Sequence, residues 1–408
     1  MSLQDTRPSD ITSSDDEFLF RKDSAERLLA DATALRPLLE SHAAAHEEKG
    51  ELAAEVIEAL DKIGAFSMSA PRRIGGLSQS SKSMAAVAAE LAKGCPSTAW
   101  VYTIYNSCLW FASKLPQAIQ KSVFADGIPR ICSPQNGMGQ LVPDGDGFKL
   151  TGRWSYATGS HHAQVTMVPA ILPDQQPMLV VLPMSSVELD YTWQVAGMKG
   201  TGSDTVVANE VLVDSASICS FADISATPPA VVDSTLLEPS DYWVNYPLLR
   251  AKSLGVLIGC AEGLLDVIMA KSGGPIIYSS YAHKSDSSAY QAALGEAATK
   301  IRAARRLVEN SCDRIDEAAI ERWVLSIEER TEFRGEGALV VQILTEVVDE
   351  LMDLGGSSAF GMAGPAQRYW RDFSTAARHV LFNAQVSYET VGRHILGIEP
   401  GIVQPDML

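Results

Sequence analysis

GRWSYATGSHH, residues 152–162, is the stretch of this sequence that decides its fold. It lies in the middle of the one strongly β-like part of an otherwise helical chain, and it combines two aromatic residues, three hydroxyl-bearing Ser and Thr residues and two histidines. A second polar, glycine-rich run, GMKGTGS at residues 197–203, follows at the far end of the same β-like part. We interpret the two runs as one wall of a binding site, with helices forming the other wall.

The β-like part extends from about residue 130 to about residue 230. Segments 165–172, 178–182 and 205–213 are rich in β-branched residues, which favours strands. Asp144-Gly145 and Asp146-Gly147 are dipeptides typical of a hairpin turn. Prolines 169, 173, 177 and 183 are expected to bound strands or to lie at sheet edges, because proline cannot donate a ladder hydrogen bond.

The rest of the chain has the three- and four-residue spacing of apolar side chains that predicts helices. In the first part, Leu52, Val56, Leu60 and Ile63 recur at this spacing, and Gly64 is expected to end their helix. The last part predicts a four-helix bundle with helices at about 248–271, 287–316, 322–354 and 365–396. We therefore expect a mainly α protein with a loose arm (1–18), an N-terminal helical domain (19–132), a β-barrel or sandwich domain (133–235) and a C-terminal bundle (236–408).

Composition excludes several classes of protein. The 408 residues carry a net charge of −17, which disfavours binding to nucleic acid or to an anionic membrane. No apolar run approaches the roughly 20 residues that span a bilayer, and the first residues do not read as a secretory signal. The six cysteines are scattered without a CxxC pair, so we expect neither disulfides nor a zinc site, and a cytoplasmic location.

The 152–162 run also suggests a ligand. A flavin ring needs a flat apolar face and a hydrogen-bonding group at its N5 edge. Residues two apart on a strand point to the same side of the sheet, so Tyr156 and Thr158, or Trp154 and Tyr156, could supply both. The alternative is an ordinary aromatic strand that covers the core.

Motifs along the whole chain resemble one family. The landmarks are Gly75-Gly76, STAW at 97–100, GRWSYATG at 152–159, GMKGTGS at 197–203, Gly355-Gly356 and QRYWRD at 367–372. In this order and spacing, the chain resembles the acyl-CoA dehydrogenase fold family from about residue 25 to 400. It is most similar to the group D two-component flavin-dependent monooxygenases, which use reduced flavin (FADH2 or FMNH2) and O2 through a C4a-hydroperoxyflavin.

The resemblance implies roles for individual residues. Tyr156 would lie near the flavin ring, and Thr158 would hydrogen-bond N5 or O4 and hold the activated oxygen. Ser203 and the 200–203 backbone would contact the ribityl or phosphate part. Gly355 and Gly356 would approach a cofactor in a neighbouring subunit, which implies a homotetramer. The full cofactor-binding set implied is Tyr156, Thr158, Gly159, Thr201, Ser203, Gly355, Gly356 and Arg371.

One position separates a dehydrogenase from an oxygenase. Most acyl-CoA dehydrogenases carry a catalytic Glu in a Tyr-Glu-Gly-Thr run shortly after an Arg-Asp pair, and here His379 and Val380 fill the Tyr-Glu positions. Without that carboxylate there is no evident base for a proton next to a thioester. Glu389 falls about nine residues late. Group D oxygenases have a His in this region, so the resemblance implies that His379 is a catalytic acid, base or orienting group; the alternative is a polar residue on a bundle helix.

The expected substrate pocket contains one departure from the family. The resemblance implies a pocket lined by Trp100, Ile104, Cys108 and Ser133. Phenol-hydroxylating members carry a His where this chain has Cys108, and a thiol is a poor base at neutral pH unless it is activated. Either another group activates a phenol or the substrate needs no deprotonation.

Other polar groups are weaker candidates. His42 and His46 have metal-compatible spacing without an acidic partner motif, so we predict no metal site. At most one of His161 and His162 should face the site. No GxGxxG fingerprint for a nicotinamide cofactor is present, so a separate NAD(P)H:flavin reductase is expected to supply reduced flavin.

The sequence therefore predicts an oxygenase component that hydroxylates or epoxidises an electron-rich aromatic of phenolic, indole or polycyclic type. The alternatives are an acyl-CoA dehydrogenase-like dehydrogenase or oxidase and an N- or S-oxygenase of the same fold. The sequence leaves open the substrate itself and the choice between FAD and FMN.

Overall fold

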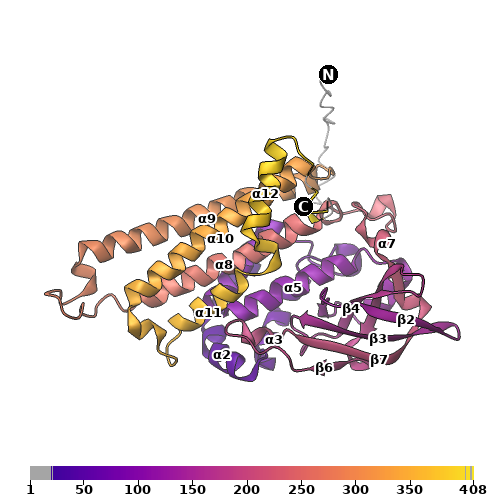
Figure 1. The fold of residues 1–408 in the computed structure, drawn as a ribbon, viewed down its shortest axis with the longest axis horizontal. Helices are drawn as coiled ribbons and strands as arrows, with labels where there is room; N and C mark the ends of the chain where they lie inside the picture. Colours follow the sequence, from indigo (N-terminus) through magenta and orange to yellow (C-terminus); the bar gives the residue numbers. More distant parts are fainter. Residues whose placement is uncertain (1–19, 21, 400, 405–406) are drawn as a thin grey trace, which may run out of the picture.

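The computed structural model describes residue 20 and residues 22–399, 401–404 and 407–408 (Figure 1). The predicted arm, residues 1–18, lies outside the described residues. The chain forms helices, then a sheet, then a second group of helices, which is the predicted order. Within the described part of the chain, no helix is long and apolar enough to cross a membrane.

The N-terminal part is helical. Gly50 and Gly64 end α2 and α3 with left-handed φ angles of 75° and 79°, which confirms the stop predicted at Gly64. Ser80 caps α4, since its side chain accepts a hydrogen bond from the Ser83 amide. The helices are α1 (Lys22–Ala34), α2 (Arg36–Lys49), α3 (Ala54–Ile63), α4 (Ser81–Gly94), α5 (Pro96–Ala112) and α6 (Gln117–Val123).

The central part is one mixed sheet of eight strands. The order is β6-β7-β3-β2-β4-β5-β8, and β1 pairs in parallel with β4. The Asp144 to Gly147 turn joins β2 to β3 as a tight hairpin, as predicted. The strands are β1 (Ile131–Cys132), β2 (Gly139–Asp144), β3 (Gly147–Ala157), β4 (Val165–Ile171), β5 (Pro177–Pro183), β6 (Glu188–Asp190), β7 (Asp204–Asp214) and β8 (Ile218–Ser220). The short helix α7 (Phe221–Ser225) follows β8.

The expectation for Pro169 was wrong, because this proline lies inside β4 opposite Leu179 of β5. On its other side, β4 pairs with β1 only at residues 165–166 and with β2 only at residues 170–171. The missing amide of Pro169 therefore falls in the gap between these two short ladders. Its carbonyl accepts a hydrogen bond from the indole of Trp154, 2.8 Å away.

The C-terminal part contains α8 (Asn245–Met269), α9 (Ser288–Ile320), α10 (Ile327–Gly355), α11 (Ala366–Ala376) and α12 (Ala384–Ile395). The single helix predicted over 365–396 was wrong. After α11 the backbone turns to an extended conformation at His379, and the short 3-10 turn Val380–Phe382 separates α11 from α12. The Nδ1 atom of His379 accepts a hydrogen bond from the Leu381 amide at 3.3 Å and stabilises this turn.

Helix α5 lies between the sheet and the bundle (Figure 1). All its residues except Ile104, Ser107 and Phe111 are buried. Its apolar side chains enter both the large core of the helices and the cluster that contains Met167, Leu179 and Cys219 of the sheet. The sheet and the bundle are therefore packed on opposite sides of one helix.

Helices α4 and α8 are in backbone contact. A Cβ at Gly255 would lie 2.3 Å from the Ala85 carbonyl oxygen, and one at Gly259 would lie 2.0 Å from the Ala89 carbonyl oxygen. Such a contact cannot be relieved by a side-chain rotation, because both obstacles are backbone atoms. This close approach holds the N-terminal helices against the bundle.

We therefore expect Gly259→Ala to destabilise the protein by at least about 1–3 kcal/mol, the usual penalty for forcing a methyl group into a packed core. Gly295→Ala on the exposed face of α9, where nothing lies within 4 Å, is the matched control. This change should be neutral or stabilising by up to about 1 kcal/mol because alanine favours helix. Chemical denaturation would measure both, and equal stability of the two variants would contradict the packing argument.

Candidate functional site

The end of β3 differs from a regular strand. The pairing of β3 with β7 changes register between Trp154 and Ala157, and Tyr156 adopts a left-handed φ of 65°. Trp154 is therefore fully buried, whereas Tyr156 is 60% exposed and Thr158 is 8% exposed. The expectation that Trp154 and Tyr156 share one side by strand alternation was wrong, because the bulge breaks the two-residue period.

The turn after β3 is held against the 197–203 run. Gly159 donates its amide to the Thr201 carbonyl at 2.8 Å, and the Ser160 hydroxyl donates to the Gly202 carbonyl at 3.0 Å. Gly159 has a φ of 73°, and the hydroxyl of Tyr105 on α5 donates to its carbonyl at 2.5 Å. The two glycine-rich runs of the sequence thus form one structure, supported by α5.

Three hydroxyls form a chain whose direction is determined. Thr201 Oγ1 donates to the Met198 carbonyl at 2.8 Å. It therefore has no proton left for Ser203 Oγ, 2.7 Å away, so Ser203 donates to Thr201. The single hydroxyl proton of Ser203 is then used on Thr201, so Thr158 Oγ1 donates to Ser203 Oγ, 2.9 Å away. The free lone pairs of Thr158 can then only accept a hydrogen bond from a ligand.

An aromatic pair lies on the exposed side of this group. The rings of Tyr156 and Trp193 meet edge to face with centroids 5.6 Å apart. The Trp193 indole donates to the Met198 carbonyl at 2.9 Å, which ties it to the 197–203 run. Sequence reasoning missed Trp193, and no spacing rule could have found it.

The 197–203 run is also tied to the bundle. Asp372 accepts a hydrogen bond from the Met198 amide at 2.5 Å, and burial raises the pKa of Asp372 to about 7. Arg371 pairs with Glu47 of α2 at 2.5 Å and donates to the Ala196 carbonyl at 2.5 Å. Its Nη2 atom is buried without a partner among the described residues. Arg371 therefore positions the run.

His379 faces α5. Its ring centroid lies 5.3 Å from that of Trp100. Burial lowers the pKa of His379 to about 4, so the ring is neutral near pH 7. Because Nδ1 accepts from the Leu381 amide, the proton of the neutral ring resides on Nε2. His379 therefore offers one N–H donor.

The accessible surface of α5 forms one stripe. The partly exposed residues Ile104, Ser107 and Phe111 recur at helical spacing, and Trp100 (6%) and Cys108 (7%) flank them. The predicted residues Trp100, Ile104 and Cys108 therefore lie on one side of the helix. Burial raises the pKa of the Cys108 thiol far above its usual range, so it stays protonated and cannot act as a base.

Ser133 lies beside this stripe, next to β1. Its hydroxyl donates to the Met167 carbonyl at 2.9 Å and accepts from the Gln135 amide at 2.8 Å. Asn106, also on α5, binds the backbone of Ala65 and Ser69 and holds the loop before α4.

Known proteins match the chain along nearly its whole length. Family models for the acyl-CoA dehydrogenase N-terminal and C-terminal domains match residues 27–126 and 253–384. The oxygenase component of an FADH(2)-dependent resorcinol hydroxylase from Rhizobium sp. is 27% identical over 92% of this chain and 95% of that protein. The oxygenase subunit HsaA of a flavin-dependent monooxygenase from Mycobacterium tuberculosis is 26% identical over 92% of this chain and 97% of that protein. The structure of XiaF from Streptomyces sp. in complex with FADH2 and glycerol superposes with a TM-score of 0.87 at 28% identity, covering 94% of this chain and 98% of that one.

The chain belongs to the flavin-dependent monooxygenase oxygenase components with the acyl-CoA dehydrogenase fold. This finding confirms the predicted fold and the predicted enzyme class.

Not all the residues expected at the monooxygenase site come together. Thr158, Ser203, Thr201, Gly159 and Tyr156 form one group. Gly355 and Gly356 lie instead at the far end of the bundle, where α10 ends away from the sheet (Figure 1). Gly356 has a φ of 64°, and a Cβ there would meet nothing within 4 Å. Within one chain, these two glycines are separate from the group around Thr158.

The remaining histidines have protein partners. His161 contacts Asp204 at 2.6 Å and Glu51 at 3.1 Å, and His162 bonds the Leu52 carbonyl at 2.8 Å. His46 lies 3.6 Å from the Cys95 sulfur. No group of metal-binding side chains occurs among the residues that the structure describes.

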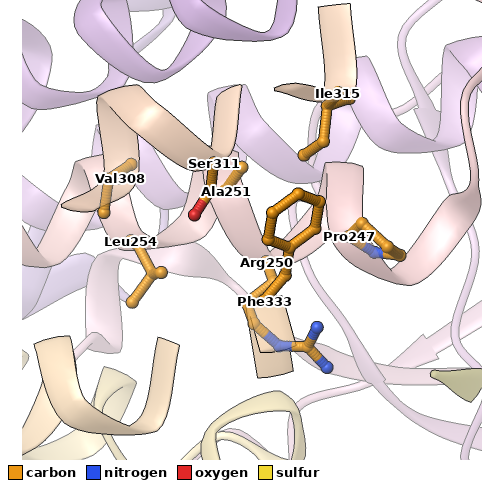
Figure 2. Close-up of a pocket in the computed structure, with 8 residues that line it drawn as sticks. All are labelled: Pro247, Arg250, Ala251, Leu254, Val308, Ser311, Ile315 and Phe333. Carbon is orange, nitrogen blue, oxygen red and sulfur yellow. The ribbon is translucent and has the colours of Figure 1, made fainter. Parts of the chain in front are cut away.

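One small cavity lies inside the bundle and is distinct from the α5 stripe (Figure 2). Its walls come from α8, α9 and α10, and Figure 2 shows the Phe333 ring and the Arg250 side chain among the residues that line it. At about 10 Å³ it holds no more than one water molecule, so it is not a substrate pocket. The lining residues are Pro247, Arg250, Ala251, Leu254, Val308, Ser311, Ile315 and Phe333.

Asp372 leads to a pH prediction. Its pKa is raised from 3.8 to about 7 in the folded protein, so the folded state binds more protons between these pH values. The stability contributed by the protonated form is complete below about pH 4 and is lost as pH rises through 7. Asp372→Asn keeps the acceptor for Met198 and should remove this loss, which is on the order of a few kcal/mol. Unfolding free energies at pH 5 and pH 8 would test this, with exposed Asp353→Asn as control, and an unchanged pH slope would refute it.

Proposed function

We propose that this enzyme uses reduced flavin and O2 to hydroxylate or epoxidise an electron-rich aromatic small molecule of phenolic, indole or polycyclic type. The observation that carries the proposal is the hydroxyl chain that leaves Thr158 as a pure acceptor. Reduced flavin carries a hydrogen on N5 and donates there, whereas oxidised flavin accepts at N5. Thr158 therefore fits the reduced cofactor.

The surroundings of Thr158 also fit a flavin. The exposed ring of Tyr156, paired with Trp193, offers an apolar aromatic surface close to the hydroxyl chain. Gly159 and Gly202 have positive φ angles, and the absence of a Cβ lets Tyr105 and His161 pack directly against these turns and hold them in place. When bound here, reduced flavin would supply the electrons that activate O2 for transfer of one oxygen atom to the substrate.

The residues of this chain would then do four things. Thr158, held by Ser203 and Thr201, would accept the N5 hydrogen and fix the ring edge. The Nε2–H group of neutral His379 would donate to substrate or cofactor as an orienting or acid group. Trp100 and Ile104 would cover the substrate ring and exclude water, which prevents loss of activated oxygen as peroxide. Ser133 would contact the substrate at the edge of the α5 stripe.

The dehydrogenase alternative lacks its base. The side chain of Val380, which occupies the position of the expected Glu, is 78% exposed and aliphatic. Glu389 is exposed on α12. Burial is the whole cause of the lowered pKa of His379, so no carboxylate among the described residues acts on it. An N- or S-oxygenase of the same fold stays a second candidate, favoured by Cys108 in place of a base.

The relatives support the coarser features of the proposal. An oxygenase component implies a separate reductase, which we propose supplies FADH2 or FMNH2 from NAD(P)H. The resorcinol hydroxylase relative favours a phenolic aromatic. Open space at Gly356 fits the approach of a neighbouring subunit, so we propose a homotetramer in the cytoplasm.

Removal of the Ser203 hydroxyl tests the direction of the hydrogen bonds from Thr158 through Ser203 to Thr201. In Ser203→Ala, Thr158 loses its acceptor and becomes free to donate, so oxidised flavin should gain affinity relative to reduced flavin. Loss of one hydrogen bond of about 1 kcal/mol corresponds to a five- to tenfold change in that ratio. Anaerobic titrations with reduced and oxidised flavin would measure it, with Ser160→Ala as control. An unchanged ratio in Ser203→Ala would contradict the assignment.

Product analysis tests the activity itself. With a generic flavin reductase and a panel of phenols, indoles and polycyclic aromatics, one class should gain a single oxygen atom from O2. Thr158→Ala should release more hydrogen peroxide and less product per reduced flavin consumed, whereas Thr158→Ser should retain coupling. Reduction of bound flavin by an acyl-CoA thioester under anaerobic conditions would favour the dehydrogenase instead.

A further inference from the structure

Lys252 is a buried cation without a visible partner. It lies near the N-terminal end of α8 with 0% of its surface exposed. Its Nζ atom has no hydrogen-bond partner among the described residues. An ammonium group out of water is strongly destabilising unless a counter-charge or hydrogen bonds compensate it. The folded protein therefore either keeps this amine neutral or reserves it for a ligand.

The surroundings of Lys252 contain no carboxylate that acts on it. Among the described titratable groups, Cys108 of α5 is the one whose charge influences Lys252, and burial keeps that thiol protonated. Burial lowers the pKa of Lys252 to about 7, so the amine can both take up and release a proton near neutral pH. Burial also lowers the pKa of Arg250, a second buried cation on α8, to about 9, so it stays charged near pH 7 although its Nη1 and Nη2 atoms have no hydrogen-bond partner among the described residues.

A second buried lysine shows how this protein otherwise compensates such a charge. Lys114, 3% exposed, lies 4.6 Å from the ring centroid of Trp110 and donates to Thr227 Oγ1 at 3.2 Å. The carboxylate of Asp241 also acts on it. Among the described residues, Lys252 has none of these compensations.

The position of Lys252 relates it to the substrate stripe. Cys108, its neighbour, is the last of the three residues Trp100, Ile104 and Cys108 on one side of α5. At 1.5 Å per residue, the eight residue steps from Trp100 to Cys108 span roughly 12 Å. His379 contacts the Trp100 end of the row. An aromatic molecule along this row would thus have His379 at one end and Lys252 at the other.

We propose that Lys252 binds and deprotonates a hydroxyl group of the substrate, and that the substrate is therefore a phenol. The inference rests on the proposed monooxygenase function and names its substrate class. In the step, the phenolic O–H bond breaks and its proton forms a new N–H bond on neutral Nζ. The resulting ammonium pairs with the phenolate, whose oxygen enriches the ring in electrons before oxygen transfer. Lys252 thus supplies the base that Cys108 cannot.

A binding experiment without flavin tests the proton transfer directly. 4-Nitrophenol, whose phenol and phenolate forms differ in colour, is titrated with the protein at a pH below its own pKa. Wild type should produce the phenolate absorbance on binding. Lys252→Met should not, whereas Lys114→Met should behave like wild type. Methionine is similar in length to lysine but uncharged, so Lys252→Met removes an unpaired buried amine without opening a large cavity. We therefore expect the melting temperature of Lys252→Met to equal or exceed that of wild type.

Turnover provides the second readout. With reduced flavin and a phenol, Lys252→Met should lower kcat/KM about a hundredfold, the usual contribution of a general base. For wild type we expect kcat/KM to rise with pH through about 7 as the amine becomes neutral, and Lys252→Met should abolish this rise. A merely structural role would not move the pH profile.

The outcomes separate the two proposals. Phenolate formation in both wild type and Lys252→Met, or phenol hydroxylation with the same kcat/KM and pH profile in both, would overturn the role of Lys252 and leave the monooxygenase function standing. Lys252-dependent phenolate formation without any flavin-dependent oxygenation would support the phenol site and overturn the proposed function.

Discussion

The burial of α5 on every side except one stripe is the constraint on which the rest of the structure depends. The helix packs against the sheet on one side and against the bundle on the other, so its polar groups must find partners in both. Tyr105 donates to Gly159 and thereby positions the turn after β3, and Asn106 holds the loop before α4. The single stripe of accessible surface on α5 is what remains for a ligand. A helix that builds the core thus also supports the site.

The polar side chains of the site differ in how many of their hydrogen-bonding atoms are paired within the protein. The Thr158, Ser203 and Thr201 hydroxyls bond one another in a fixed direction, and this order leaves one acceptor at the surface of the group. His379 uses Nδ1 on its own backbone and keeps one N–H free. The Nζ atom of Lys252 has no hydrogen-bond partner in the part of the chain that the structure describes. Hydrogen bonds within the protein therefore make Thr158 an acceptor and His379 a donor towards a ligand. An acceptor of this kind favours a ligand atom that carries a hydrogen over one that does not.

The bundle is joined to the 197–203 run and to the N-terminal helices by a few close contacts. Asp372 and Arg371, adjacent on α11, bind the 197–203 run from the bundle side. Close backbone contact at Gly255 and Gly259 holds α8 to α4. These contacts join segments more than 160 residues apart, so the site forms only when all three parts have folded.

The sequence by itself determined the order of helices and sheet, the stop at Gly64, the β2–β3 hairpin and the family, because these depend on periodicity, turn chemistry and local motifs. It also brought Tyr156, Thr158 and Ser203 into one hypothesis. Only the tertiary structure decided the bulge that separates Trp154 from Tyr156, the break that places His379 outside a helix, the position of Pro169 between two ladders and the isolation of Lys252. Each of these depends on which backbone groups find partners in distant segments, and spacing along the chain carries no information about that.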